Sequence, residues 1–246
     1  MKYSAKDHAF VYGVIAQALI RQGGEAKSVL EESIKVYGAQ RGSRMGQTAD
    51  AFGDQRTMQT YLLYGEWVSA AGEMIVDVTE ETPCAVWHVH KCPWNEAWTE
   101  LGMLDVGKYY CKHVDRELVH GYNPDLELGV GETQTNGDSY CYFKWTGAEI
   151  TPANELENAK ISEKVGTVRL RNWAYHMAHI YKTMGEVIQK RLGCAARSAV
   201  FFEADERLLS RYGQHLVDLM HAGLIVDFWV TPSLKPVELL PVLFQD

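Results

Sequence analysis

The spacing of apolar residues changes partway along the chain, and this change limits the folds that it can adopt. Ala26, Leu30, Ile34 and Tyr37 recur at intervals of three and four, which places them on one face of a helix. From Glu66 onward, apolar residues alternate with polar ones as they do along strands. A chain in which helices precede strands, and helices follow again, is predicted to be α+β.

Further segments extend this pattern over the whole chain. Helices are expected at residues 10–20, 26–45, 95–119 (in two pieces), 172–192 and 205–220, and strands at 86–91, 126–130, 140–145 and 224–230, with a polar link at 147–163. The predicted fold is α+β, with N-terminal helices, a central antiparallel sheet with helices, and C-terminal helices. We divide it into an N-terminal helical region, residues 1–65, and an α+β ligand-binding and catalytic region, residues 66–246, packed as one compact unit.

Composition excludes several classes of protein. A chain of 246 residues with 46% hydrophobic and 23% charged residues can bury a large core. No apolar run approaches the roughly 20 residues of a membrane span, and the first residues lack a secretion signal, so we expect a cytoplasmic protein without a membrane partner. The net charge of -8 argues against nucleic acid as a partner. A small-molecule substrate remains, and a homo-oligomer is left open.

The five cysteines form no regular close spacing, and their number is odd. In a protein expected in the cytoplasm, this pattern favours free thiols or metal ligands over a framework of disulfides. Each cysteine is therefore a candidate for chemistry.

Arg41 extends the apolar face of the helix predicted at 26–45, which would bury its guanidinium group. A buried cation needs either an acidic partner in the protein or an anionic ligand. The sequence leaves two interpretations open: a pair with a structural carboxylate, or a clamp for the carboxylate of a substrate.

His88, His90 and Cys92 fall on one face of the strand predicted at 86–91, and all three can bind zinc, copper or iron. Three ligands on one strand do not complete a structural site, so we expect no cofactor and keep a transition metal here as the alternative. We favour a role for one of the histidines, His88, as a general acid or base. Trp87, on the other face, is expected in the core or in a pocket wall.

Asn136-Gly137 lies between two alternating segments, which is a strong signal for a β-hairpin. If the turn has two residues, Thr135 pairs with Asp138 and Glu132 lies opposite Cys141. Glu132 and Cys141 would then project together into an apolar layer. Burial there raises the pKa of a carboxyl, so this pair suits proton transfer better than thiolate attack; a plain core cysteine is the alternative.

Cys111 and Asp115 lie four residues apart in the second piece of the helix predicted at 95–119, so the thiol and the carboxyl stand one turn apart on an apolar face. Such a pair favours a functional role. The alternative is a buried carboxyl that caps a neighbouring loop.

The order of these motifs resembles that of the L-2-amino-thiazoline-4-carboxylic acid hydrolase family. The resemblance rests on Tyr37-Gly38, Arg41-Gly42 and Arg44-Met45, on Tyr110 to Asp115, on Asn123-Pro124, and on the Gly-Asp-x-x-Cys-x-Phe pattern of residues 137–143. It covers residues 37–145 and is looser in the last hundred residues. The 137–143 element also resembles the small-molecule-binding domains of the vinyl-reductase type.

The resemblance implies hydrolytic opening of a 2-aminothiazoline ring. As a hypothesis, Cys111 serves as nucleophile or proton shuttle and is oriented by Asp115, Glu132 and Cys141 face the ring, and Asp138 fixes the hairpin end. The full set of candidate catalytic residues is Cys111, Asp115, Cys141, Glu132, His88 and Asp138, and the candidate substrate-binding residues are Arg41, His90, Asn123 and Trp87. The alternatives are a metal-dependent hydrolase or lyase, and a sensor of the vinyl-reductase type that binds without turnover.

Overall fold

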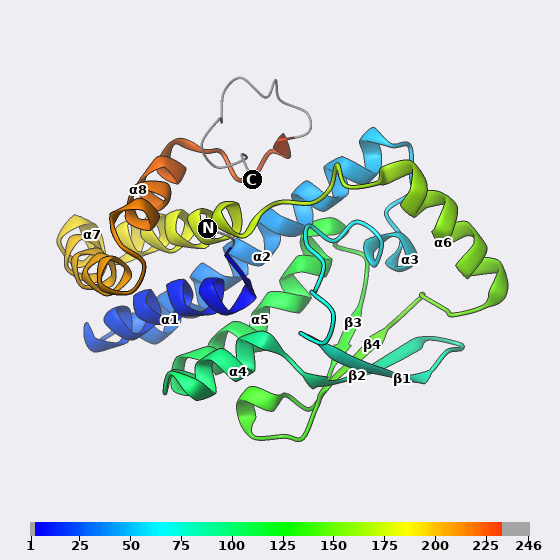
Figure 1. Cartoon of the computed structure of the whole chain (residues 1–246), viewed down its shortest axis with the longest axis horizontal. Helices are drawn as coiled ribbons and strands as arrows, with labels where there is room; N and C mark the ends of the chain where they lie inside the picture. Colours follow the sequence, from blue (N-terminus) through cyan, green and yellow to red (C-terminus); the bar gives the residue numbers. More distant parts are fainter. Residues whose placement is uncertain (1–2, 233–246) are drawn as a thin grey trace.

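The structure, a computed structural model, describes residues 3–232. Its elements are α1 (Ala5–Arg21), α2 (Ala26–Ala51), α3 (Met58–Tyr61), β1 (Ile75–Glu80), β2 (Ala85–Lys91), α4 (Pro93–Glu100), α5 (Leu104–Tyr122), β3 (Leu128–Val130), β4 (Cys141–Trp145), α6 (Pro152–Val165), α7 (Trp173–Tyr212) and α8 (Gln214–Ala222), with 3-10 turns η1 (Gln134–Asn136) and η2 (Gly223–Ile225). The predicted α+β class, with helices before and after a small antiparallel sheet, is confirmed (Figure 1).

The four strands form one antiparallel sheet in the order β1-β2-β4-β3. Trp87 lies opposite Phe143, and Phe143 lies opposite Val130, so these side chains share one face. Leu128 and Trp145, also paired, belong to the same buried core as residues of α5, which runs beside the sheet (Figure 1). This inner face of the sheet and α5 together enclose one side of the candidate site.

Glycines allow α2 and α5 to cross in main-chain contact. A β-carbon at Gly38 would lie 2.8 Å from the Glu117 β-carbon, and one at Gly42 would lie 2.6 Å from the Tyr122 nitrogen. Such contacts are closer than atoms can approach, so only glycine fits at this crossing. The crossing sets the turn of α2 that carries Arg41 against the turn of α5 that carries Asp115.

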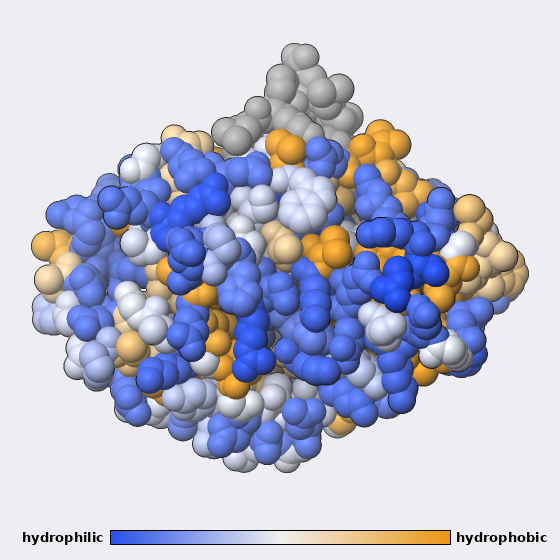
Figure 2. Space-filling view, turned by 180° about the vertical axis from the view of Figure 1, so that it is seen from behind, coloured by the Kyte–Doolittle hydropathy of each residue, from blue (hydrophilic) through white to orange (hydrophobic). Residues whose placement is uncertain are grey.

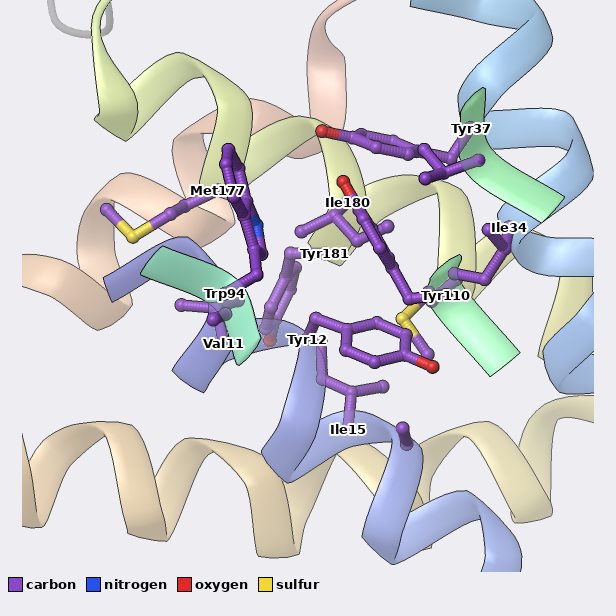
Figure 3. Packing of buried hydrophobic residues seen from close by; sticks show 14 of the residues in the cluster. Val11, Tyr12, Ile15, Ile34, Tyr37, Trp94, Tyr110, Met177, Ile180 and Tyr181 are labelled. Atoms are coloured by element: carbon purple, nitrogen blue, oxygen red, sulfur yellow. The ribbon is translucent and has the colours of Figure 1, made fainter. Parts of the chain in front are cut away.

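The helical part of the core is rich in aromatic residues. Tyr12, Tyr37 and Tyr110 are buried, and ring centroids lie 5.1 Å apart for Tyr12 and Tyr110 and 6.2 Å apart for Tyr37 and Tyr110. Ile180 and Met177 of α7 pack in the same cluster, which joins helices from both ends of the chain (Figure 3). The core holds the helices that carry the candidate site in fixed positions.

Three predictions about secondary structure need correction. The segment predicted as a polar link holds α6, whose residues are mostly exposed, so no apolar periodicity marks it; Thr151 caps its start. The helix predicted at 172–192 is longer, because α7 breaks at Gly193, with φ 86°, and continues at once to Tyr212. The helix predicted at 205–220 is instead divided at Gly213 between α7 and α8.

The strand predicted at 224–230 is wrong. This segment holds η2 and turns, and Ile225 is 85% exposed while Val226 and Phe228 are buried. In the described part of the chain it has no place in the sheet, whose four strands are all supplied by residues 75–145.

The surface opposite to the view of Figure 1 is mostly hydrophilic, with separate small apolar patches (Figure 2). Among residues 3–232 no helix combines the length and the apolar character that a membrane crossing requires. The last part of the predicted second region, residues 233–246, lies outside the described residues. The boundary at residue 66 stays a prediction.

Candidate active site

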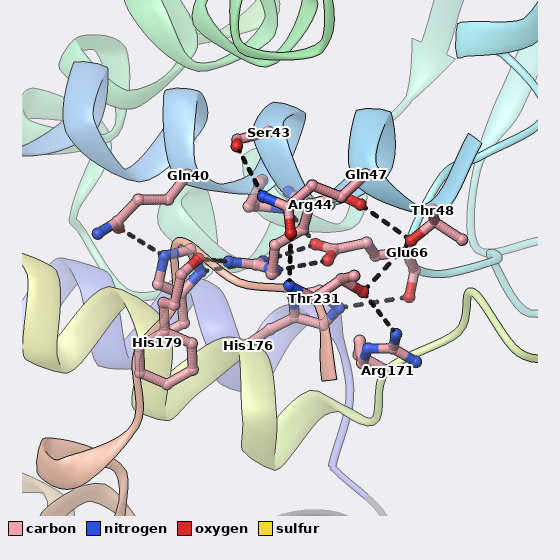
Figure 4. Close-up of polar contacts among 12 residues, drawn as sticks. Gln40, Ser43, Arg44, Gln47, Thr48, Glu66, Arg171, His176, His179 and Thr231 are labelled. Atoms are coloured by element: carbon pink, nitrogen blue, oxygen red, sulfur yellow. Dashed lines mark hydrogen bonds and ion pairs between the residues drawn. The ribbon is translucent and has the colours of Figure 1, made fainter. Parts of the chain in front are cut away.

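A buried ion group lies where α2 meets the segment after α3. Arg44 donates to both oxygens of Glu66, each at 2.8 Å, and also to the Phe228 carbonyl oxygen (Figure 4). Arg41 reaches the same carboxylate through its Nε atom, 3.3 Å from Oε2. These two cations hold the pKa of Glu66 at about 2, against the effect of burial.

Arg41 therefore has an acidic partner in the protein, as one of the two interpretations of the sequence requires. Its side chain is 6% exposed, and within the described residues the contact with Glu66 is its one hydrogen bond. Its two terminal nitrogens thus remain available to a ligand, so the second interpretation also stays open.

The buried histidines around this group do not add charge at neutral pH. Burial and the nearby guanidinium of Arg41 lower the pKa of His176 to about 3, and burial also lowers the pKa values of His8 and His179 well below the usual range. With two arginines and one glutamate, the group has one positive charge in excess. Arg41 carries that excess, since Arg44 has the better geometry with Glu66.

Asp115, on α5, is close enough to Arg41 to feel its charge. The side chain is half-buried, and burial raises its pKa from 3.8 to about 6, although Arg41 and Arg116 act in the opposite direction. A carboxyl with this pKa exchanges its proton readily near neutral pH, which suits general acid–base chemistry.

Three thiols from three different elements lie in the neighbourhood of Asp115. Cys92 lies at the start of α4, Cys111 lies on α5 and Cys141 begins β4, and each thiol is close enough to feel the charge of Asp115. Burial raises the pKa of Cys92 to about 12, and it also raises the pKa values of Cys111 and Cys141. All three are therefore neutral thiols at neutral pH.

Two buried tyrosines also lie near Arg41 and Asp115. Tyr61 of α3 and Tyr110 of α5 are buried, and both feel the charges of Arg41 and Asp115. Burial raises both of their pKa values, so their hydroxyl groups keep their protons and can donate hydrogen bonds. The hydroxyl end of Tyr110 lies beside that of Tyr37 (Figure 3).

A cavity of about 260 Å³ opens between α5 and the segment that follows β3. Cys111 forms part of its wall. The other lining residues are Lys108, Tyr109, Lys112, Arg116, Val130, Gly131, Thr133 and Asn136. Three of these side chains are cationic, which favours an anionic ligand in this cavity; Arg41 and Asp115 are not among its lining residues.

The predicted register of the hairpin is confirmed, but its predicted turn is wrong. Leu128 pairs with Trp145 and Val130 with Phe143, and the Tyr142 amide donates to the Glu132 carbonyl oxygen at 3.0 Å. Instead of a two-residue turn, the chain forms η1 and passes through Gly137 with φ 98°.

This wider loop changes the position of Glu132. Its main chain still pairs with Tyr142, but its side chain is exposed and does not share an apolar layer with the buried Cys141. Cys141 is buried, and its Sγ accepts a hydrogen bond from the Gln134 amide at 3.3 Å. Asp138 is exposed and its carboxylate accepts from the Thr133 amide at 2.7 Å, which closes the loop.

Two of the three residues predicted on one face of β2 lie together. His88 stacks on Tyr140, with ring centroids 4.1 Å apart, and the ring of His90 lies 6.2 Å from that of His88 and 3.2 Å from Asp77 on an exposed part of the sheet. Cys92 lies beyond the end of β2, at the start of α4, and is close enough to Cys111 for the two thiols to affect each other, so the prediction that it joins the two histidines is wrong. In the part of the chain that the structure describes, no three His, Cys, Asp or Glu side chains are placed to hold a metal ion.

The last two predicted residues have structural contacts. Trp87 lies on the inner face of the sheet, with its ring centroid 5.1 Å from that of Trp145. Asn123 ends α5, and its amide donates to the Arg56 carbonyl oxygen at 2.7 Å and accepts from the Asp125 amide at 3.0 Å. Both the nitrogen and the oxygen of the Asn123 amide therefore have main-chain partners in the protein.

Sequence reasoning missed Glu66, Tyr61 and Tyr110 as parts of this site. For Glu66 a signal existed, since a buried Arg41 requires a carboxylate and Glu66 opens the segment after the N-terminal helices. Tyr61 and Tyr110 carry no comparable signal, because tyrosines on helical faces are common core residues.

Comparison with known proteins places this site within one family. The family model described as L-2-amino-thiazoline-4-carboxylic acid hydrolase matches residues 4–145, more than half of the chain, and the chain belongs to that family. The match includes Arg41, Arg44, Glu66, Asp115, the two tyrosines and the three thiols, whereas Phe228, His176 and His179 lie outside it. No curated protein and no solved structure matches the chain.

Proposed function

We propose that this protein is a hydrolase that opens a small cyclic amidine, such as the ring of 2-amino-thiazoline-4-carboxylate, by acid–base chemistry at Asp115. One observation supports this most: a carboxyl with a pKa of about 6 faces a buried guanidinium that has donors to spare. The description of the matching family supports a substrate of this class, and the charges of the site fit it.

The reaction requires one water and two proton transfers. The amidine-like carbon of the ring is bonded to nitrogen and sulfur. Protonation of a ring heteroatom makes this carbon more electrophilic, water adds to it and loses a proton, and the bond to the protonated heteroatom breaks. The product is a carbamoyl-cysteine, which has the atoms of the substrate plus one water. No oxidant or reductant is needed.

Arg41 holds the carboxylate of the substrate through its two terminal nitrogens in this proposal. A guanidinium group binds a carboxylate with two parallel hydrogen bonds, which fixes the ring as well as its charge. Glu66 keeps Arg41 in place through Nε, which leaves the other side of the guanidinium for the ligand.

Asp115 transfers the protons, and Cys111 contacts the ring as a neutral thiol. The raised pKa of Cys111 disfavours the nucleophile role that the sequence suggested, because a thiol attacks as its thiolate. Tyr61 and Tyr110 supply hydrogen-bond donors to the oxygen or nitrogen on which charge develops.

The test is turnover of 2-amino-thiazoline-4-carboxylate and related cyclic amidines, with mass spectrometry to detect a gain of one water. We expect Asp115→Asn to lose at least about 100-fold in kcat, the usual effect of removing a general acid or base. Arg41→Gln should raise KM for the acid but not for its carboxamide. Asp105→Asn, an exposed carboxyl on the same helix, serves as the control.

Full activity of Asp115→Asn would contradict the assignment of that residue. Absence of a hydrated product from every cyclic amidine tested, with the wild-type protein folded, would contradict the proposed activity as a whole.

A further inference from the structure

We propose that binding of a carboxylate ligand at Arg41 makes Asp115 take up a proton from solvent, so that the bound state starts the reaction with Asp115 as an acid. This inference rests on the proposed function, since it requires the carboxylate site at Arg41. It adds which protonation state of Asp115 is the reactive one.

The charges of the site lead to this coupling. Glu66 is neutralised by Arg44, and Arg41 carries the remaining positive charge. In the free protein the ionised form of Asp115 is the other anion that Arg41 stabilises. A substrate carboxylate would replace Asp115 in that role, and two carboxylates beside one guanidinium leave one negative charge without compensation.

The fold holds the two groups in this arrangement. The crossing of α2 and α5 at Gly38 and Gly42 is in main-chain contact, so Arg41 cannot move away from the turn of Asp115 without separating the helices. Glu66 restrains the guanidinium from the other side. A ligand that binds the terminal nitrogens of Arg41 would therefore place its charge near the turn of α5 that carries Asp115.

The groups around Asp115 offer no second cation of equal strength. Arg41 faces it from α2, Tyr61 from α3, Cys92 from the start of α4 and Cys141 from β4. On its own helix, Arg116 acts on it as well as Tyr110 and Cys111, but Arg116 is exposed and donates to the Val130 carbonyl oxygen. The tyrosines and thiols are neutral near pH 7 and cannot replace the charge of Arg41.

The sign of the pH dependence follows from this exchange. A carboxylate ligand lowers the stabilisation of ionised Asp115 by Arg41 and adds a like charge, so the pKa of Asp115 rises in the complex above its value of about 6. Between the two values binding takes up a proton. Affinity must then weaken as pH increases above 6, approaching a tenfold loss per pH unit.

The test uses thiophene-2-carboxylate, a five-membered sulfur ring that the enzyme cannot hydrolyse and that has no second group titrating near neutrality. Isothermal titration calorimetry at pH 7.0 (about one unit above the free pKa) is run in phosphate and in Tris, two buffers with different ionisation enthalpies. We expect uptake approaching one proton per ligand, and no comparable uptake with thiophene-2-carboxamide.

Variants separate this inference from the proposed function. Asp115→Asn should bind the carboxylate without proton uptake and with an affinity independent of pH, whereas Asp105→Asn should behave as the wild type. Binding that is lost in Arg41→Gln but takes up no proton would overturn the inference and leave the carboxylate site intact. Uptake that persists in Asp115→Asn would also overturn it. Absence of any Arg41-dependent binding would overturn the carboxylate site, and the inference with it.

Discussion

Gly42 of α2 lies against the main chain at Leu118 of α5, so close that no β-carbon fits between the two helices. This contact is the reason that Arg41 and Asp115, on neighbouring turns, face each other. The candidate site therefore depends on a residue that has no side chain and takes no part in the chemistry.

Gly42→Ala should separate the two helices. The added methyl group would meet main-chain atoms of Leu118 and Tyr122, which cannot rotate away, and we expect a loss of about 2 kcal/mol in the free energy of unfolding. Urea unfolding measures this. In the control Gly65→Ala, the new methyl group has its nearest atom 3.8 Å away, so the change should stay within about 0.5 kcal/mol. Equal stability of both variants would contradict the close crossing.

Asp115→Asn should stabilise the protein at alkaline pH. The folded pKa of Asp115, about 6, lies above its unfolded value of 3.8. The folded protein therefore loses stability as pH rises from about 4 to 6, because the ionised carboxyl is less stable in the folded state than in the unfolded one. A shift of this size corresponds to at most about 3 kcal/mol at pH 8, and half-exposure reduces it. Thermal unfolding should show a gain for Asp115→Asn at pH 8 that disappears near pH 4. A lower melting temperature at pH 8 would argue that Asp115 is a structural anion.

Glu66 should contribute stability that is lost in acid. Its pKa is lowered from 4.5 to about 2, so the contribution is complete above about pH 4.5 and falls as pH decreases toward 2. Removing the carboxylate leaves two buried cations, and Glu66→Gln should cost about 3–5 kcal/mol at pH 7. Denaturant unfolding at pH 7 and pH 2.5 tests this, and the difference from wild type should shrink at the lower pH.

The matched control for Glu66 is Glu157→Gln, which removes an exposed carboxylate 3.1 Å from Lys160. An exposed pair contributes about 0–1 kcal/mol, so this variant should differ little from the wild type at either pH. A similar small effect of Glu66→Gln would mean that the buried ion group is not needed for the fold.

Local patterns in the sequence predicted those parts of the site that depend on local structure. The four-residue interval between Cys111 and Asp115 fixes their common face on a helix, and the period of two fixes the register that pairs residues 128–130 with 143–145. Glu132 was misplaced because the turn type, not the register, decides where pairing stops. Glycine, here Gly137, allows several turn types, so the sequence alone did not decide among them.

Long-range contacts were beyond these patterns. The side chain of Cys92 could continue the face of β2 that carries His88 and His90, or it could turn inward at the start of α4. Nothing near Cys92 in the sequence distinguishes these two positions. The buried position predicted for Arg41 indicated that it needs a carboxylate partner. It did not indicate which carboxylate, because Glu66 is 25 residues away in the sequence. The site is assembled by the crossing of α2 and α5, and a crossing is a property of two helices together.

The pH dependence of turnover should separate free enzyme from complex. If the protonated form of Asp115 is reactive, kcat/KM falls above about pH 6, the pKa in the free protein, approaching tenfold per pH unit. In contrast, kcat should hold to higher pH, because the bound carboxylate keeps Asp115 protonated. Steady-state kinetics from pH 5 to 9 would measure both. The inflection of kcat/KM near pH 6 should vanish in the residual activity of Asp115→Asn. It should persist in Glu132→Gln, which removes an exposed carboxyl outside the site. A kcat/KM that rises through pH 6 would instead identify Asp115 as a base that acts in its ionised form.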